Sequence, residues 1–165
     1  MAHKKSGAFA CPCGSDKNYV VCCQPLHLKK DKAKTPEQLM RSRYSAYALG
    51  DLGQYLVDTW HPDYLGGLSA EALNHRGSNW IGLNVVQQSV STKGNEGVVE
   101  FVAAFEDIEC PSPRQFLRER SDFSRIDGVW LYTQGDMKAV TYPKRNDACL
   151  CGSGIKFKKC CAKFL

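Results

Sequence analysis

Two stretches of alternating residues, Trp80-Ile-Gly-Leu-Asn-Val85 and Val99-Glu-Phe-Val-Ala-Ala-Phe105, decide the fold of this chain. Every second residue is apolar, a period typical of a β-strand with one buried face. The apolar positions are Ile81, Leu83 and Val85 in the first stretch and Val99, Phe101, Ala103 and Phe105 in the second. Between them, Lys93-Gly-Asn-Glu-Gly97 has the composition of a turn. We therefore expect two antiparallel strands joined by a short loop.

Two further strands are expected toward the C-terminus. Pro111-Ser-Pro113 interrupts the chain before a third strand, which we place at about residues 114–125. Asp127-Gly128 is a strong hairpin signal. Val129–Gln134 then has the composition of a fourth strand.

Toward the N-terminus, the apolar spacing changes to that of helices. Thr35-Pro36-Glu37-Gln38 combines an N-cap, a proline at the first helical position and a capping-box partner, and Gly50 supplies a stop. A second helix is expected from Asp51 to His61-Pro62, and a third, shorter one after Ser69. Helices followed by antiparallel strands predict an α+β fold in which the helices cover one face of a curved sheet.

The same thirteen-residue pattern stands on either side of this region, at residues 11–23 and 149–161. It consists of Cys-x-Cys, eight residues and Cys-Cys, and it uses eight of the nine cysteines. Four thiols in so short a span are typical of a tetrahedral metal site, for which zinc is the preferred ion. Because protein ligands would fill all four positions, we expect each ion to be structural and to fold its small module.

Three other interpretations of the clusters stay open. Disulfides would need an oxidising compartment, and the residues before Cys11 lack the hydrophobic region of a secretory signal. Redox-active vicinal thiols would use the two Cys-Cys pairs but would leave Cys-x-Cys unexplained. Iron and iron–sulfur clusters also suit four thiolates. We therefore expect two structural zinc ions, with iron as the alternative, in a cytoplasmic protein.

The charge is informative mainly in its distribution. The formal net charge is +5, but eight thiolates add −8 and two Zn²⁺ ions add +4, which leaves +1. Lysines crowd the second cluster, where they either balance its negative charge or form a docking surface. The chain has no apolar run long enough to cross a bilayer. It also has no motif for sequence-specific nucleic-acid recognition.

The composition suggests three domains. Residues 24–34 are polar and basic without periodicity, which suits a linker, and residues 136–148 form a second connector. We expect an N-terminal cysteine module with its linker at residues 1–34, an α+β core at 35–140 and a C-terminal cysteine module at 141–165.

The motifs resemble those of known families. The cysteine pattern, with Gly-Ser and an aromatic residue, resembles the SEC-C motif, the zinc-binding tail of the SecA translocase. Two such motifs around Pro36-Glu-Gln-Leu-Met-Arg-Ser-Arg-Tyr-Ser-Ala-Tyr47 and Thr59-Trp-His-Pro62 resemble the bacterial YchJ family over nearly the whole chain. This resemblance implies a nuclear-transport-factor-two-like (NTF2-like) or cystatin-like core. In such a core, helices pack on a strongly curved antiparallel sheet that often encloses a conical pocket.

The resemblance also implies eight metal ligands. These are Cys11, Cys13, Cys22, Cys23, Cys149, Cys151, Cys160 and Cys161. The first motif departs from the family pattern at Asp16, where glycine is usual, and the last at Ala148, Leu150 and Ile155, where proline, proline and lysine are common. Since none of these residues is a ligand, the departures affect loop stiffness and surface charge rather than the metal capacity.

For function, we expect a non-enzymatic adaptor. The similar tail of SecA contacts the chaperone SecB and ribosomal or phospholipid surfaces, which implies docking on a SecB-like chaperone or on the ribosome. The residues expected to contact the partner are Lys156, Lys158, Lys159, Arg41 and Arg43. Folds of the resembled type often form homodimers through the open face of the sheet, so a homodimer is a further expectation.

The alternative is an enzyme or small-molecule binder that uses the pocket of the core. The candidate residues are His61, Asp63, Arg120 and Asp122, with Trp60, Tyr44 and Trp80 as walls. Each polar candidate also has a structural explanation, because His61 stands at a helix end and Arg120 fits a cross-strand pair. We therefore assign no catalytic residue.

Overall fold

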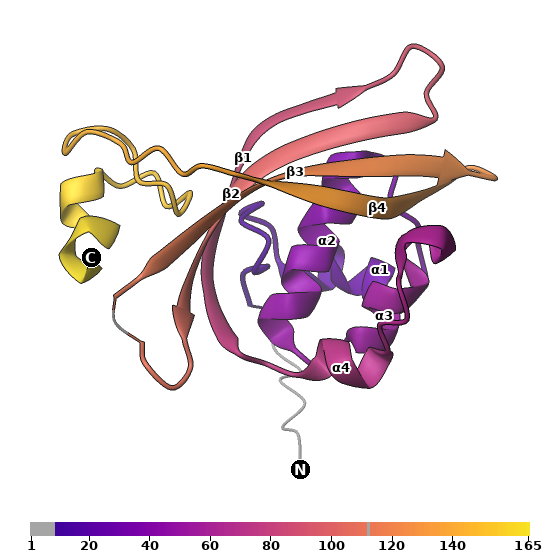
Figure 1. Cartoon of the computed structure of the whole chain (residues 1–165), viewed down its shortest axis with the longest axis horizontal. Coiled ribbons are helices and arrows are strands. Elements are labelled where there is room, and N and C mark those ends of the chain that lie inside the picture. The colour runs from indigo at the N-terminus through magenta and orange to yellow at the C-terminus, as the bar shows by residue number, and fades with distance from the viewer. Residues whose placement is uncertain (1–8, 112) are drawn as a thin grey trace.

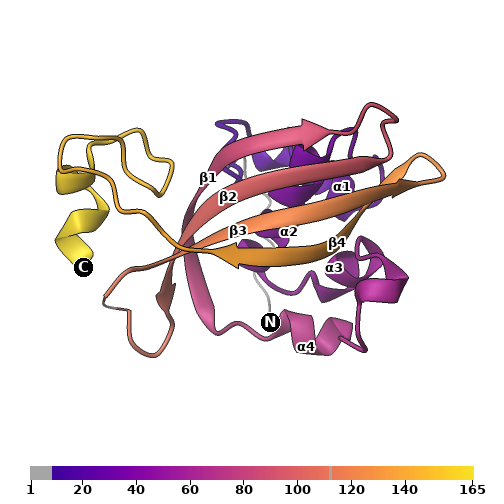
Figure 2. The same cartoon turned by 45° about the horizontal axis from the view of Figure 1, so that its top comes forward.

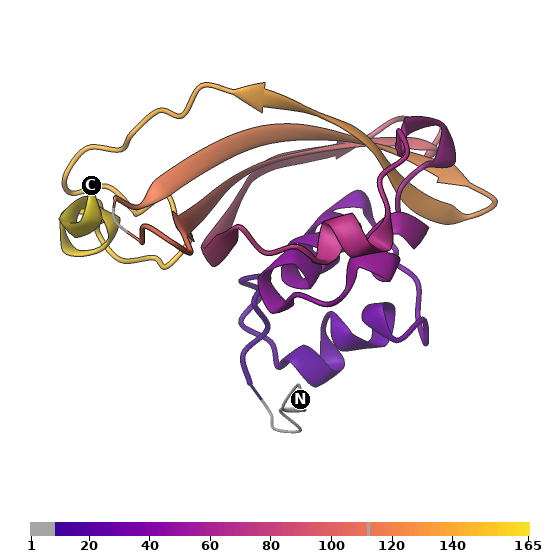
Figure 3. The same cartoon turned by 60° about the horizontal axis from the view of Figure 1, so that its bottom comes forward.

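The computed structural model describes residues 9–111 and 113–165, and these residues form two layers. A sheet of four antiparallel strands, in the order β1-β2-β3-β4, curls over a layer of helices (Figures 1 and 3). The strands are β1 (Ser78–Val90), β2 (Glu96–Asp107), β3 (Gln115–Ile126) and β4 (Val129–Lys138). The helices are α1 (Gln24–His27), α2 (Pro36–Leu49), α3 (Gly53–Asp58) and α4 (Ala70–Asn74). The expected α+β fold is confirmed.

The start of α2 is confirmed at the level of its cap. The hydroxyl oxygen of Thr35 accepts from the backbone N–H of Gln38 at 3.1 Å. The Gln38 side chain reaches back one residue further than a standard capping box and accepts from the N–H of Lys34 at 2.7 Å. The helix ends at Gly50, where φ is 75°. No helix within residues 9–111 and 113–165 combines the length and hydrophobicity needed to cross a bilayer.

The second helix is shorter than expected. Residue Asp51 has a φ of 57°, which is incompatible with a right-handed helix, so α3 begins only at Gly53. The helix ends at Asp58. The Thr59 hydroxyl donates to the Tyr55 carbonyl at 2.8 Å, and the next residue, Trp60, forms an isolated β-bridge with Tyr132 of β4. The third helix follows Ser69 as expected, and the Ser69 hydroxyl accepts from the N–H of Ala72 at 3.1 Å.

All four strands lie where the sequence placed them, and β4 extends four residues beyond the expected end at Gln134. The hairpin at Asp127-Gly128 has φ values of 49° and 78°, as a two-residue turn with two left-handed positions requires. Figure 2 shows the strands side by side, with β1 at one edge of the sheet and β4 at the other.

A β-bulge corrects the face assignment in β1. The pairing with β2 shifts between Trp80 and Gly82, so the alternation of side chains is interrupted there. Leu83 packs in the main core, whereas Ile81 packs with the C-terminal cysteine module. The expectation that Ile81 shares a face with Leu83 was therefore wrong.

The main core lies between α2 and the concave face of the sheet. It is formed by Leu39, Met40 and Tyr44 from α2 and by Leu83, Val99, Ala103, Phe123 and Trp130 from the strands. A second cluster surrounds Ala104 of β2, whose neighbour Ala103 packs in the main core. Since consecutive residues of a strand point to opposite faces, this second cluster lies on the other side of the sheet.

Residues 24–34 are not a simple linker. They contain α1, and Leu26 is only 3% exposed where it packs with Ala46, Tyr55 and Leu56. His27 is also buried, and its ring bridges the Tyr19 hydroxyl and the Ser42 carbonyl at 2.8 Å each. A four-residue helix is too short to show a sequence period, which is why this packing was missed.

Candidate metal centres

The N-terminal cluster gathers four sulfurs from two short segments. Cys11 and Cys13 lie on a loop that is closed by a bridge between Ala10 and Asn18. Cys22 and Cys23 directly follow a short 3₁₀ turn, Tyr19–Val21. All four sulfurs lie within 4.8 Å of one another, and the Sγ–Sγ distances are 3.6 Å for Cys13–Cys22 and 3.9 Å for Cys22–Cys23.

The C-terminal cluster repeats this arrangement. Its loop is closed by a bridge between Ala148 and Lys156, and its 3₁₀ turn is Phe157–Lys159. The Sγ–Sγ distances are 3.6 Å for Cys151–Cys160 and 4.0 Å for Cys160–Cys161. The two halves of the molecule thus build the same cluster twice.

The repetition extends to the backbone. The N–H of Cys11 donates to the Lys17 carbonyl at 2.8 Å, and in the second module Cys149 and Ile155 form the same bond at 2.8 Å. The left-handed position within this loop is held by Gly154 at φ 72° and by Asp16 at φ 60°. Aspartate is among the residues that tolerate this region, so the departure at Asp16 keeps the loop conformation.

The sulfur distances fit a tetrahedral thiolate site. A metal–sulfur distance of about 2.3 Å places tetrahedral ligands about 3.8 Å apart, close to the distances in both clusters. A disulfide would need about 2.05 Å, and all nine cysteines are free. Both clusters could therefore hold a metal ion.

Proton sharing within each cluster supports a cation there. Hydrogen bonds from Cys13 and Cys23 lower the pKa of Cys11 to about 3. Hydrogen bonds with Cys11 and Cys13, together with burial, raise the pKa of Cys23. In the second cluster burial raises the pKa of Cys160, but hydrogen bonds from Ser153 and Cys151 bring it down to about 7. Some thiols ionise at the expense of others because the negative charge is confined to a small space. A divalent cation would relieve this competition.

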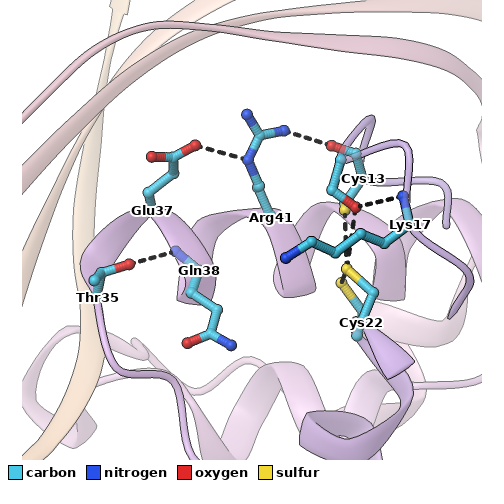
Figure 4. A network of polar contacts seen from close by, with 9 residues as sticks. Cys13, Lys17, Cys22, Thr35, Glu37, Gln38 and Arg41 are labelled. Atoms are coloured by element: carbon cyan, nitrogen blue, oxygen red, sulfur yellow. Dashed lines mark hydrogen bonds and ion pairs between the residues drawn. The ribbon is translucent and has the colours of Figure 1, made fainter. Parts of the chain in front are cut away.

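The N-terminal cluster is attached to α2. Arg41 donates from Nη1 to the carbonyl of Cys13 at 2.6 Å and from Nε to Glu37 at 2.8 Å (Figure 4). The Ser45 hydroxyl donates to the sulfur of Cys23 at 3.4 Å. Such bonds around a thiolate site orient the ligands.

The C-terminal cluster is attached to the sheet. Arg114, just before β3, donates from Nη1 to the sulfur of Cys161 at 3.4 Å and from Nη2 to Glu106 at 2.8 Å. Its guanidinium also lies 4.2 Å from the centre of the Phe164 ring. Arg114 was not among the residues expected from the sequence, because it lies 35 positions before the nearest cysteine of this cluster.

The residues expected to contact a partner fall into two groups. Lys156 and Lys159 are exposed and Lys158 is half-buried, all on the C-terminal module. Arg41 is half-buried in the contacts described above, and Arg43 is buried. Arg43 therefore does not lie on the surface where we expected it.

The residues expected to form a pocket are also divided. Tyr44, Trp60 and Trp80 line a cavity of about 260 Å³ between α2 and the sheet. His61 does not line it, and its Nδ1 accepts from the N–H of Asp63 at 3.2 Å. Arg120 pairs with Asp122 at 3.0 Å outside the cavity. His61 therefore caps the start of the Pro62–Tyr64 turn rather than the end of a helix. The Arg120 pair lies within β3 and is not cross-strand, so neither residue has the structural role expected for it.

Two charged residues of this cavity were missed, Arg43 and Glu119. The signal for Arg43 was its helical spacing, since it lies three and four residues from the core residues Met40 and Leu39. A charged residue on the apolar face of a helix indicates a buried polar site.

The fold and the two clusters define an NTF2-like domain joined to cysteine-rich SEC-C motifs. The family profile described as the YchJ middle NTF2-like domain matches residues 35–135, and the SEC-C motif profile matches residues 145–163. A UPF0225 protein of Vibrio vulnificus is 42% identical over 169 residues, which cover 93% of this chain and 99% of that protein. A second, from Shewanella sp. strain MR-4, is 41% identical over 99% of both chains. This chain belongs to the UPF0225 family, the family of YchJ.

Two solved structures share the fold. The solution structure of a SEC-C motif containing protein from Rhodopseudomonas palustris is 35% identical with a TM-score of 0.71, covering 79% of this chain and 100% of that one. The crystal structure of a SEC-C motif containing protein from Psychrobacter arcticus is 29% identical with a TM-score of 0.65, covering 94% and 97%.

Proposed function

We propose that this protein is a cytoplasmic, non-enzymatic adaptor whose terminal modules are each held by one structural zinc ion. The ligands would be the four cysteines of each cluster, and iron is the alternative metal. The sulfur distances support this assignment, since they match tetrahedral thiolate coordination without any rearrangement. We further propose that residues 1–34, 35–140 and 141–165 act as the three functional units.

The observation that carries the adaptor role is the surface of the C-terminal module. Lys156, Lys158 and Lys159 form no ion pair with any described residue. Ile155 and Leu165, on the same module, are 51% and 55% exposed. The module lies beyond the end of the sheet (Figures 1 and 2). Unpaired cations beside exposed apolar side chains suit docking on a partner.

The partner favoured by this surface is an acidic protein. Lysine rows attract carboxylates by long-range electrostatics, and the nearby apolar side chains add contact area on a protein surface. The resemblance of the motif to the SecA tail suggests a SecB-like chaperone as the first protein to test. Ribosomes are the second partner that the resemblance suggests.

The test is a binding titration with the metal-loaded chain and a SecB-like chaperone at several salt concentrations. We expect binding that weakens as salt rises and that is lost when Lys156, Lys158 and Lys159 are changed to Glu. The matched control changes Lys30, Lys32 and Lys93, which are exposed lysines elsewhere, to Glu. Equal binding by both triple variants would refute the proposed surface. Binding to ribosomes without any binding to the chaperone would refute the proposal that the partner is an acidic protein of this kind.

A further inference from the structure

Arg43 of α2 is a buried cation without a counter-ion. It is 5% exposed, and no carboxylate among the described residues forms an ion pair with it. Nη1 donates to the carbonyl of Leu56 and the hydroxyl of Thr59, both at 2.7 Å. These are neutral acceptors, and within residues 9–111 and 113–165 the other guanidinium nitrogens have none. Neither of these nitrogens is a fully buried atom without a partner, so they face the cavity that Arg43 lines. A largely buried charge of this kind is costly unless water or a ligand in the cavity satisfies it.

Aromatic rings hold the guanidinium in place. Its central carbon lies 4.9 Å from the centre of the Trp60 ring and 4.7 Å from that of Tyr132. Burial lowers the pKa of Arg43, and Tyr47, Tyr132 and Glu119 oppose that effect. Arginine keeps its proton in proteins, so the side chain remains a fixed positive charge.

The same guanidinium belongs to the wall of the cavity described above. The other walls are mostly apolar or aromatic and include Tyr44, Trp80 and Phe101. Met137 also lines the cavity and is 64% exposed, which indicates that the cavity reaches the surface there. The volume of about 260 Å³ is slightly below the range of about 300–1,000 Å³ for drug-sized ligands, so a ligand of one or two rings would fit.

A carboxylate acceptor lines the cavity as well. The Oε1 atom of Glu119 accepts from the Ser121 hydroxyl at 2.7 Å and from the Tyr132 hydroxyl at 3.2 Å. Its Oε2 atom accepts from no donor in the described part of the chain. Tyr132 separates the two charges, since its hydroxyl bonds Glu119 and its ring packs on Arg43.

We propose that this cavity binds a small aromatic carboxylate. The carboxylate of the ligand would pair with the free N–H groups of Arg43, and its ring would pack on the aromatic walls. A hydrogen-bond donor on the ring would bond to the Oε2 atom of Glu119, for which the described residues supply no donor. This site is separate from the docking surface of the C-terminal module, so either proposal can fail without the other.

The test uses the full metal-loaded chain and two probes of the same shape, 2-naphthoate and its neutral amide, 2-naphthamide. In ¹H–¹⁵N spectra, 2-naphthoate should shift the indole N–H signals of Trp60 and Trp80. Its affinity should exceed that of the amide by about tenfold or more, because only the acid offers Arg43 a charged partner. Equal affinities, or no shift with either probe, would overturn the proposal.

Two variants locate the site. Arg43→Met should remove the preference for the acid while leaving the apolar walls intact. Because loss of Arg43 endangers folding, Leu117→Phe serves as the second variant, since Leu117 lines the cavity and a larger ring would fill it. This variant should lose binding of both probes. Wild-type affinity in Leu117→Phe would show that the probes bind elsewhere and would refute the assignment.

Discussion

Arg114 shows how a single residue links a cysteine cluster to the core. Its guanidinium contacts the sulfur of Cys161, the carboxylate of Glu106 and the ring of Phe164. A positive charge beside a thiolate favours the ionised form that a metal needs. Arg114 is therefore expected to set metal affinity in the C-terminal cluster and to leave the N-terminal cluster unchanged.

We predict that Arg114→Gln weakens metal binding by the C-terminal cluster by about 10–100-fold. A chromogenic chelator competing for zinc should then remove one ion early and the second as in the wild type. Arg125→Gln is the control, because Arg125 lies on β3, the strand that directly follows Arg114, and its guanidinium is 5.7 Å from the Trp130 ring without contacting sulfur. A single release phase in Arg114→Gln, identical to that of the control, would contradict the role of this residue.

His27 makes stability depend on pH. Burial lowers its pKa, and the Ser42 carbonyl opposes this effect. In the unfolded chain histidine titrates near about 6.5. As the pH falls below that value, the unfolded state binds a proton that the folded state still excludes, so the free energy of unfolding decreases.

We predict that the wild-type protein loses up to about 1.4 kcal/mol per pH unit from this residue below pH 6.5. The full contribution is present above that pH. His27→Gln cannot titrate and should show a shallower pH dependence in urea unfolding. Metal loss in acid affects both proteins, so the difference between their slopes isolates the histidine. Parallel curves would show that His27 is not kept neutral by burial.

At the scale of elements, both cysteine modules reach the same position of the edge strand β1. β1 is an edge strand, and edge strands present unpaired backbone groups. A Cβ atom on Gly14 would lie 3.3 Å from the carbonyl oxygen of Leu83, and one on Gly152 would lie 2.3 Å from the same atom. The two motif loops therefore meet β1 at Leu83 and leave no room for another strand to pair at that position.

The bulge in β1 provides the space for this contact. A Cβ atom on Gly82 would lie 2.2 Å from the backbone carbonyl oxygen of Cys151, which is too close for any side chain. We predict that Gly82→Ala destabilises the protein by about 1–3 kcal/mol in chemical unfolding and speeds zinc release from the C-terminal cluster. Gly77→Ala is the control, because a Cβ atom on Gly77 would meet no described atom within 4 Å. Equal stability of the two variants would argue against this packing.

The sequence predicted those elements whose signals are local. The cap at Thr35, the stop at Gly50 and the hairpin at Asp127-Gly128 each depend on a few neighbouring residues, and the structure confirms all three. The close packing at Gly82 was not predictable, because the backbone that it meets belongs to Cys151, near the far end of the chain. Burial of Arg43 depends likewise on the aromatic rings of two distant segments.

The candidate metal centres follow the same rule. The spacing of the cysteines indicated which thiols gather, and the structure brings the same eight together. It could not indicate the neighbours in the folded protein, because Ser45 and Arg114 reach the sulfurs from other elements. Local spacing therefore predicts a cluster, whereas its attachment to the core depends on tertiary packing.

At the scale of the whole molecule, the two cysteine modules have the same local structure but pack on different parts of the core, one on α2 and the other on the sheet. The N-terminal copy is attached to α2 through Arg41 and Ser45, on the helical side of the protein (Figure 3). The C-terminal copy packs on Ala104 and Phe116 of the sheet. Since the supports differ, loss of one metal should not by itself release the other.

We predict that Cys13→Ser and Cys151→Ser each remove one zinc ion and leave the second bound. Serine is nearly isosteric but is a poor zinc ligand, so each cluster should fail separately. Elemental analysis of the purified variants would measure one zinc per chain in both. Loss of both ions from either variant would show that the clusters are coupled through β1.

The most direct test is native mass spectrometry of freshly purified, reduced protein, because it weighs the folded chain with everything bound to it. We predict a mass equal to the chain plus two zinc ions with all cysteines reduced, and the same spectrum reports whether a homodimer forms. A compact, folded chain that carries no metal, or whose clustered cysteines are joined as disulfides, would contradict the account.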